Sequence, residues 1–91
     1  MPIVMLVDNP AGSQQVYDKI RQHLGLERPA GGILHVAGPS PNGGWRVIEV
    51  FESEDDASRF LKERFGPALK AVGFSGPPPE PQYWPVYNYM R

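Results

Sequence analysis

The chain has 91 residues, a formal net charge of −1 and no cysteine. This length predicts a single domain over residues 1–91, and the lack of cysteine excludes disulfides, thiolate metal sites and a thiol nucleophile. Nine basic residues are scattered among ten acidic ones. The sequence therefore predicts no basic surface, and we expect neither nucleic acid nor a membrane as a partner.

The sequence also indicates where the protein resides. No apolar run approaches the roughly 18–20 residues that a membrane-spanning helix needs. The N-terminal residues lack the basic flank and the long apolar stretch of a secretory signal. Together with the absence of cysteine, these features predict a cytoplasmic protein.

The first half of the chain predicts a strand, a helix and a second strand. Residues 2–7 form a short apolar, β-branched run that a turn at residues 8–12 closes. Ser13 is a good N-cap, and a helix is expected over residues 13–25 because the apolar side chains there recur at helical spacing. These side chains are Val16, Tyr17, Ile20 and Leu24. The apolar run 33–38 predicts the second strand.

The second half predicts a strand, a long helix and a final strand. Residues 45–51 are expected to pair with the second strand as a hairpin. A helix is expected from Ser53 to Gly73, because one apolar stripe continues through Gly66-Pro67, where we expect a kink.

The C-terminal part of the chain is rich in proline and then in aromatic residues. Residues 77–81 are expected to lie extended. Residues 83–90 predict the last strand, which Pro85 places at an edge of the sheet, since proline cannot donate a ladder hydrogen bond. The order βαββαβ predicts an α+β, ferredoxin-like sandwich: a four-stranded antiparallel sheet with two helices on one face.

Two polar residues interrupt the apolar strands of the hairpin. His35 lies in the middle of residues 33–38, and Glu49 lies in the middle of residues 45–51. If the hairpin turns around residues 41–42, the two side chains are opposite each other. Directly opposed side chains have Cβ atoms about 4.5–5.5 Å apart, close enough for a contact between a carboxylate and an imidazole.

The alternation of side chains along each strand predicts the two faces of the sheet. The helices need an apolar floor, so four residues are expected beneath them: Leu34, Val36, Ile48 and Val50. His35 and Glu49 then fall on the helix-free face with Ile33, Trp45, Val47 and Phe51. A sheet face this apolar is not expected to be exposed to solvent. We therefore expect a homodimer that pairs sheet against sheet through this face and encloses a small-molecule pocket.

Three stretches carry a resemblance to a known family. They are His35 in the second strand, Gly-Gly-Trp-Arg-Val at 43–47 and Pro-Val-Tyr-Asn at 85–88. With the order of elements, they resemble small bacterial members of the dimeric α/β barrel superfamily related to the antibiotic biosynthesis monooxygenases. This superfamily includes cofactor-free quinone-forming monooxygenases, polyketide cyclases, haem degraders, lactone isomerases and proteins with no known activity. The resemblance therefore implies a fold and a dimer, but not a reaction.

The haem-degrading branch of this superfamily fits the sequence poorly. Asn9 could stand for the asparagine of that branch, but Phe51 stands where it needs tryptophan. No histidine lies where its axial ligand would be, since Ala57, Phe60 and Leu61 stand there. Because the only other histidine, His23, lies on the first predicted helix, we expect no metal site and no cofactor.

These features favour an enzyme that acts on an aromatic or polyketide-like molecule as a monooxygenase, cyclase or isomerase. His35 would be the base, and Glu49 would fix its tautomer and stabilise its protonated form. Substrate-binding residues would be Asn9, Trp45, Phe51 and Tyr87, the last because relatives often carry a histidine at its place.

Two alternatives to an enzyme stay open. The protein could be a binding module of the same shape without turnover, or a structural dimer whose polar pair only holds the interface. The aromatic residues could equally pack a dimer, and Asn9 could be a turn former.

Overall fold

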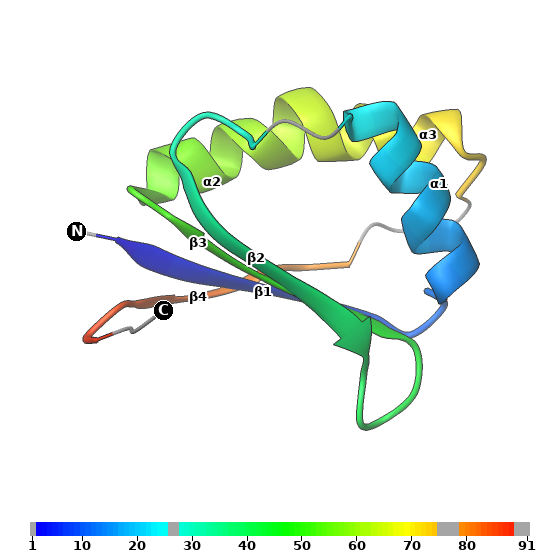
Figure 1. The fold of residues 1–91 in the computed structure, drawn as a ribbon, viewed down its shortest axis with the longest axis horizontal. Helices are drawn as coiled ribbons and strands as arrows, with labels where there is room; N and C mark the ends of the chain where they lie inside the picture. The colour runs from blue at the N-terminus through cyan, green and yellow to red at the C-terminus, as the bar shows by residue number, and fades with distance from the viewer. Residues whose placement is uncertain (1, 26–27, 75–78, 89–91) are drawn as a thin grey trace.

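The computed structural model describes residues 2–25, 28–74 and 79–88, which form one sheet and two helical segments (Figure 1). In chain order the elements are β1 (Ile3–Asn9), α1 (Gln14–Leu24), β2 (Gly32–Pro39), β3 (Trp45–Phe51), α2 (Glu54–Phe60), η1 (Leu61–Phe65), α3 (Gly66–Ala71) and β4 (Gln82–Pro85). The second helical segment runs without a break through α2, η1 and α3. Within these ranges, no helix is both long and apolar enough to cross a bilayer.

The strands form one antiparallel sheet in the order β2-β3-β1-β4. The helices lie over one face of this sheet and leave the other face open (Figure 1). This arrangement confirms the predicted α+β, ferredoxin-like fold. The strand β4 lies at an edge, as Pro85 indicated, and the pairing ends just beyond it with a hydrogen bond from the Val86 N–H to the Pro2 carbonyl.

Two predicted segments lie partly outside the described residues. The predicted strand 83–90 extends past residue 88, and the structure begins and ends β4 earlier, at Gln82 and Pro85. Of the Pro-rich segment 77–81, only residues 79–81 are described, and they lead into β4.

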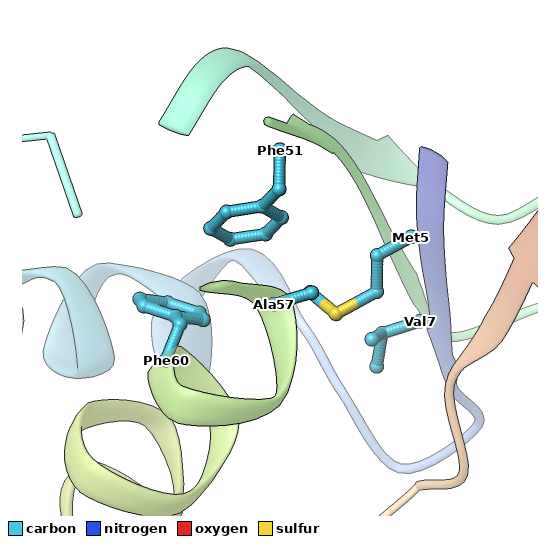
Figure 2. Close-up of a cluster of buried hydrophobic side chains, with 5 residues drawn as sticks. All are labelled: Met5, Val7, Phe51, Ala57 and Phe60. Atoms are coloured by element: carbon cyan, nitrogen blue, oxygen red, sulfur yellow. The ribbon is translucent and has the colours of Figure 1, made fainter. Parts of the chain in front are cut away.

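The main core lies between the sheet and α2. Met5 and Val7 of β1 and Phe51 of β3 pack against Ala57 and Phe60 of α2 (Figure 2). Phe51 is completely buried, and its ring centroid lies 5.7 Å from that of Phe60. The helix-facing side of the sheet therefore carries the odd-numbered residues of β1 and β3.

The prediction of which face the helices cover is wrong. Leu34 and Val36, expected beneath the helices, are 41% and 51% exposed on the helix-free face. The register places a continuous apolar set on that face: Val4, Leu6, Leu34, Val36, Ile48, Val50 and Trp84. The alternation could not reveal this, because both sets of alternating side chains in β1 and β3 are apolar.

Both helical segments begin at the serines that the sequence predicted. The Ser13 hydroxyl accepts the Val16 N–H at 3.2 Å, and the Ser53 hydroxyl accepts the Asp56 N–H at 3.2 Å. Three acidic residues in the first turn of α2 complement the positive end of its dipole. Local chemistry therefore fixes where each helix starts over the sheet.

The second helical segment is continuous, as predicted, but contains a widened turn. The Gly66 N–H donates to the Leu61 carbonyl, five residues back. In a regular α-helix the ring of Pro67 would press on the Glu63 carbonyl, and proline offers no N–H in exchange. A π-helical turn relieves both problems, and such turns occur often at functional sites. Here the turn brings Leu61 and Phe65 to the wall of a cavity described below.

The turn between β2 and β3 packs closely on the turn after β1. Gly43 and Gly44 both have positive φ, at 95° and 84°. A Cβ at Gly44 would collide with the backbone of Asn9 and Pro10, whereas one at Gly43 would meet nothing within 4 Å.

These two glycines predict different costs of substitution. We expect Gly44→Ala to lower the free energy of unfolding by about 2–4 kcal/mol, because strain and collision add. Gly43→Ala should cost about 1–2 kcal/mol from the positive φ alone. Urea denaturation of both variants checks this, and equal losses would contradict the close packing of the two turns.

Candidate functional site

Three polar side chains from three elements form a chain of hydrogen bonds beneath α1. His35 of β2 lies opposite Glu49 of β3, which confirms the predicted register. Its Nδ1 is 2.6 Å from Glu49 Oε1, and its Nε2 is 2.6 Å from the hydroxyl of Tyr17 on α1. The contact with Tyr17 shows that the pair faces the helices, so its predicted place on the helix-free face is wrong.

Donor and acceptor chemistry assigns the protons of this cluster for an ionised Glu49 and a neutral His35. An ionised Glu49 can only accept, so the neutral His35 carries its proton on Nδ1 and leaves Nε2 to accept the Tyr17 O–H. Burial raises the pKa of the Tyr17 phenol, and the Glu49 and Asp18 charges raise it further against the opposing effect of Arg21. The Tyr17 hydroxyl therefore stays protonated at neutral pH and donates a hydrogen bond.

Glu49 and His35 differ in how far they are buried. Glu49 is buried, with 5% of its surface exposed, whereas one third of the His35 side chain is exposed. A buried carboxylate needs a hydrogen-bonded partner, and His35 is that partner. The imidazole thus joins an inaccessible charge to a surface that a small molecule can reach.

On its inner side the cluster borders an apolar cavity between α1 and the sheet. The cavity has a volume of about 50 Å³. Its walls include Met5, Val7, Val16, Trp45, Leu61 and Phe65. This space suits a few atoms rather than a whole ligand, since sites for drug-sized molecules measure about 300–1,000 Å³.

On its outer side the cluster borders a larger surface hollow. This outer hollow has a volume of about 240 Å³ and runs along the edge strand β2. Arg28 and Pro29 before β2 line it together with Gly32, Ile33 and Leu34 of that strand. His35 and Glu49 line both the outer hollow and the inner cavity, so the imidazole stands between them.

The structure brings some of the predicted site residues together and separates others. Asn9 and Trp45 line the inner cavity with His35 and Glu49. Phe51 belongs to the core and does not border the cavity. Tyr87 is fully exposed after β4 and also lies outside it.

Asn9 and Trp45 differ in how their polar groups are satisfied. The Asn9 Oδ1 accepts the Ala11 N–H at 3.1 Å, which is the turn-forming role that the sequence left open. The Trp45 indole N–H is buried and has no hydrogen-bond partner among the described residues. Because an unpaired buried donor is costly, this N–H favours a polar atom in the inner cavity.

Tyr17 is the site residue that the sequence analysis did not identify. It was assigned only to the apolar stripe of the first helix, because its partner His35 was placed on the other face. The sequence does contain a feature that could have identified Tyr17, since a tyrosine on the core-facing side of a helix needs a hydrogen-bond partner for its hydroxyl. Its ring also stacks near His35, with centroids 6.0 Å apart, and lies 5.5 Å from the ring of Trp45.

Comparison with known proteins supports the fold. No protein-family model matches the chain, and no curated protein matches it. A candidate antibiotic biosynthesis monooxygenase from Chloroflexus aurantiacus J-10-fl is similar in structure, with a TM-score of 0.61 and 15% identity over 98% of this chain and 95% of its own. A variant of SnoaB, a cofactor-independent oxygenase from Streptomyces nogalater, matches with a TM-score of 0.59 and 17% identity over 98% of this chain and 94% of its own.

These likenesses confirm the predicted resemblance at the level of the fold. The chain has the ferredoxin-like arrangement of proteins similar to antibiotic biosynthesis monooxygenases, over nearly its whole length. At this level of identity, any activity has to be argued from the side chains of this chain.

Proposed function

We propose that the protein is an enzyme that removes a proton from an aromatic or polyketide-like small molecule without a bound cofactor. The observation that carries this proposal is the hydrogen-bonded chain Tyr17–His35–Glu49, whose central imidazole is partly exposed and lines both the outer hollow and the apolar cavity. A buried carboxylate behind an accessible imidazole is an arrangement suited to general base catalysis.

Each member of the chain has a distinct role in the proposed step. His35 Nε2 accepts the substrate proton, and the Glu49 carboxylate stabilises the imidazolium that forms. The Tyr17 hydroxyl, released from Nε2, donates a hydrogen bond to the oxygen on which negative charge develops. The apolar walls of the inner cavity keep water from this anion.

The reaction that follows depends on the substrate. A carbanion or enolate with extended aromatic character can reduce dioxygen itself, which gives a monooxygenase without a cofactor. The same anion can instead be reprotonated elsewhere or close a ring. Oxygenation is our first choice, because one structural neighbour is a cofactor-independent oxygenase.

Anthrone provides a direct test of this function. Its methylene protons are acidic, and its oxidation by dioxygen yields anthraquinone and water. Without oxygen, the protein should accelerate exchange of these protons for deuterium, measured by NMR. In air, it should accelerate oxygen uptake and the formation of the quinone. Acceleration of neither process would contradict a proton-abstracting function on this substrate class.

A non-catalytic role, either ligand binding or purely structural, is the alternative. It is favoured by the fact that Tyr17, His35 and Glu49 already satisfy one another within one chain. Shifts of the Tyr17 and His35 NMR signals on addition of anthrone, without exchange or oxidation, would indicate a binding module. If the NMR signals do not shift and anthrone is neither exchanged nor oxidised, the cluster has a purely structural role.

We also propose that the helix-free face mediates a homodimer, with different residues from those first expected. Its centre is apolar, and Leu34, Val36 and Trp84 are each more than 40% exposed. At one end Arg46 makes two hydrogen bonds to Asp8, at 2.7 and 2.9 Å, which hold the pKa of Asp8 below its usual value. An apolar surface of this kind is typical of the centre of an interface.

The dimer can be tested by one substitution on this face. Val36→Lys should convert a dimer at micromolar concentration into a monomer, because it places a charge within the exposed apolar set. Sedimentation equilibrium measures the mass, and His23→Lys on the exposed surface of α1 is the control. A wild-type protein that is monomeric throughout this range would contradict the proposal.

A further inference from the structure

Three arginines surround the accessible side of His35. Arg21 comes from α1, Arg28 from the segment before β2 and Arg64 from η1. They share with His35 and Glu49 a second surface hollow of about 90 Å³, which we call the arginine hollow. Arg28 also borders the outer hollow, and Arg21 also borders the inner cavity. Each of the three spaces that His35 lines therefore also has at least one arginine in its lining.

Among the described residues, no acidic side chain forms an ion pair with an arginine of this hollow. The ion pairs of the described residues join His35 to Glu49, Arg46 to Asp8 and Arg59 to Asp56, so none of them includes Arg21, Arg28 or Arg64. Glu49 is the acidic residue that lines the hollow, and it is already bonded to His35.

The three arginines are not equivalent. Arg64 donates to the Leu24 carbonyl at the end of α1, so part of its role is to hold that helix. Arg28 is exposed, and Arg21 is half-buried beside Tyr17, where its charge opposes the rise in the pKa of that phenol. Within the part of the chain that the structure describes, Arg21 and Arg28 thus form no ion pair, and we take their guanidinium groups as the ligand donors.

We propose that the arginine hollow binds a carboxylate carried by the substrate, so that the enzyme selects aromatic acids over neutral aromatic molecules. The inference rests on the proposed function, since it places the reacting carbon at His35. Guanidinium groups bind carboxylates through paired, charge-assisted hydrogen bonds. Three arginines and one carboxylate give the hollow a net positive charge, which favours an anionic group.

This assignment gives the substrate an orientation. The carboxylate lies between Arg21 and Arg28, and the ring occupies the outer hollow along β2. The acidic position then faces His35 Nε2, with the Tyr17 hydroxyl beside it. Fixing one end of a substrate in this way is how binding energy positions the reacting atom.

A matched pair of probes tests the charge preference without relying on turnover. The probes are 2-naphthoate and the neutral 2-acetonaphthone, which have the same ring and nearly the same shape. Titration followed by amide NMR shifts should show naphthoate binding roughly tenfold or more tightly, as expected for one charge-assisted contact. Added salt should weaken the binding of naphthoate and leave that of the ketone nearly unchanged.

Substitutions locate the charge that is responsible. Arg21→Gln and Arg28→Gln should each weaken naphthoate binding about five- to tenfold and leave binding of the ketone unchanged. Lys19→Gln is the control, because it removes the same charge from an exposed position of α1 that borders neither the cavity nor the hollows described here. Arg64 is left intact because of its contact with α1.

The outcomes separate this inference from the proposed function. Equal affinity for the two probes would overturn the carboxylate preference while leaving the anthrone test of proton abstraction untouched. A preference for naphthoate that survives both arginine substitutions, or is lost equally in Lys19→Gln, would also overturn the assignment. If inorganic phosphate displaces naphthoate at lower concentration than acetate does, the hollow is a phosphate site instead. If neither naphthoate nor the ketone binds, the proposed carboxylate site is overturned.

Discussion

Replacement of His35 by glutamine should reduce the deuterium exchange and oxidation of anthrone by about 10²–10⁴-fold, the range that a positioned general base contributes. Glutamine can still donate an N–H to the buried Glu49 carboxylate, so the fold keeps a partner for that charge. It cannot accept a proton at neutral pH. The variant therefore separates the chemistry of the imidazole from its structural contact.

His35→Ala is the necessary companion to this variant. It leaves the Glu49 carboxylate buried without its partner, which costs about 3–5 kcal/mol when such a pair is broken. We expect this protein to lose activity and also to melt at a lower temperature, measured by circular dichroism. His35→Gln should melt close to the wild type.

The combination of these results decides between the readings of the polar cluster. An active, stable His35→Gln protein would show that His35 is not the base. Loss of activity with retained stability supports catalysis. Unfolding of both variants would favour the structural role, in which the cluster only joins α1 to the sheet.

Tyr17→Phe distinguishes the hydroxyl from the ring. Phenylalanine keeps the aromatic contacts with His35 and Trp45, whose ring centroids lie 6.0 and 5.5 Å away. It removes only the donor to Nε2. Within the proposed mechanism this variant loses oxyanion stabilisation but retains the base, so its activity should fall less than that of His35→Gln.

The sequence predicts the order of elements and the register of the hairpin because those features have local causes. Serine caps mark the two helices, glycine and proline mark the turns, and the length of the β2–β3 loop sets His35 opposite Glu49. These are interactions among near neighbours in the chain, so composition and spacing are enough to identify them.

The side of the sheet on which the helices pack is a property of the whole fold. In β3 the residues Trp45, Val47 and Phe51 are as apolar as Ile48 and Val50, so a period of two has no preferred face. The presence of His35 and Glu49 then weighed against the helix-facing side. The contact that makes them acceptable there, the Tyr17 hydroxyl, comes from another element and is visible only once α1 is in place.

The arginine hollow also could not be predicted from the sequence. Arg21, Arg28 and Arg64 lie on three separate elements and share no motif or spacing. Each one taken alone is an ordinary surface residue. They line one hollow only because the fold brings α1, η1 and the segment before β2 together, and Arg64 lies in the π-helical turn before Pro67. No local pattern predicts such a convergence.

Phe51→Ala should lower the free energy of unfolding by about 3–5 kcal/mol, because it removes a large, completely buried side chain from the core. Phe51 has no exposed surface, and it packs with Met5, Ala57 and Phe60. A domain of this size has only about 5–10 kcal/mol in total. The melting temperature should therefore fall by at least about 15 °C.

This prediction also tests the role that the sequence assigned to Phe51. Sequence reasoning placed both Phe51 and Tyr87 in a substrate site, yet one is wholly buried and the other wholly exposed. Tyr87→Ala should change stability by less than about 0.5 kcal/mol, as expected for an exposed surface position. Phe51→Leu, which keeps most of the volume, should remain folded and bind naphthoate like the wild type. If Phe51→Leu instead melts normally and loses naphthoate binding, the ring belongs to the site and the boundary drawn between core and cavity is wrong.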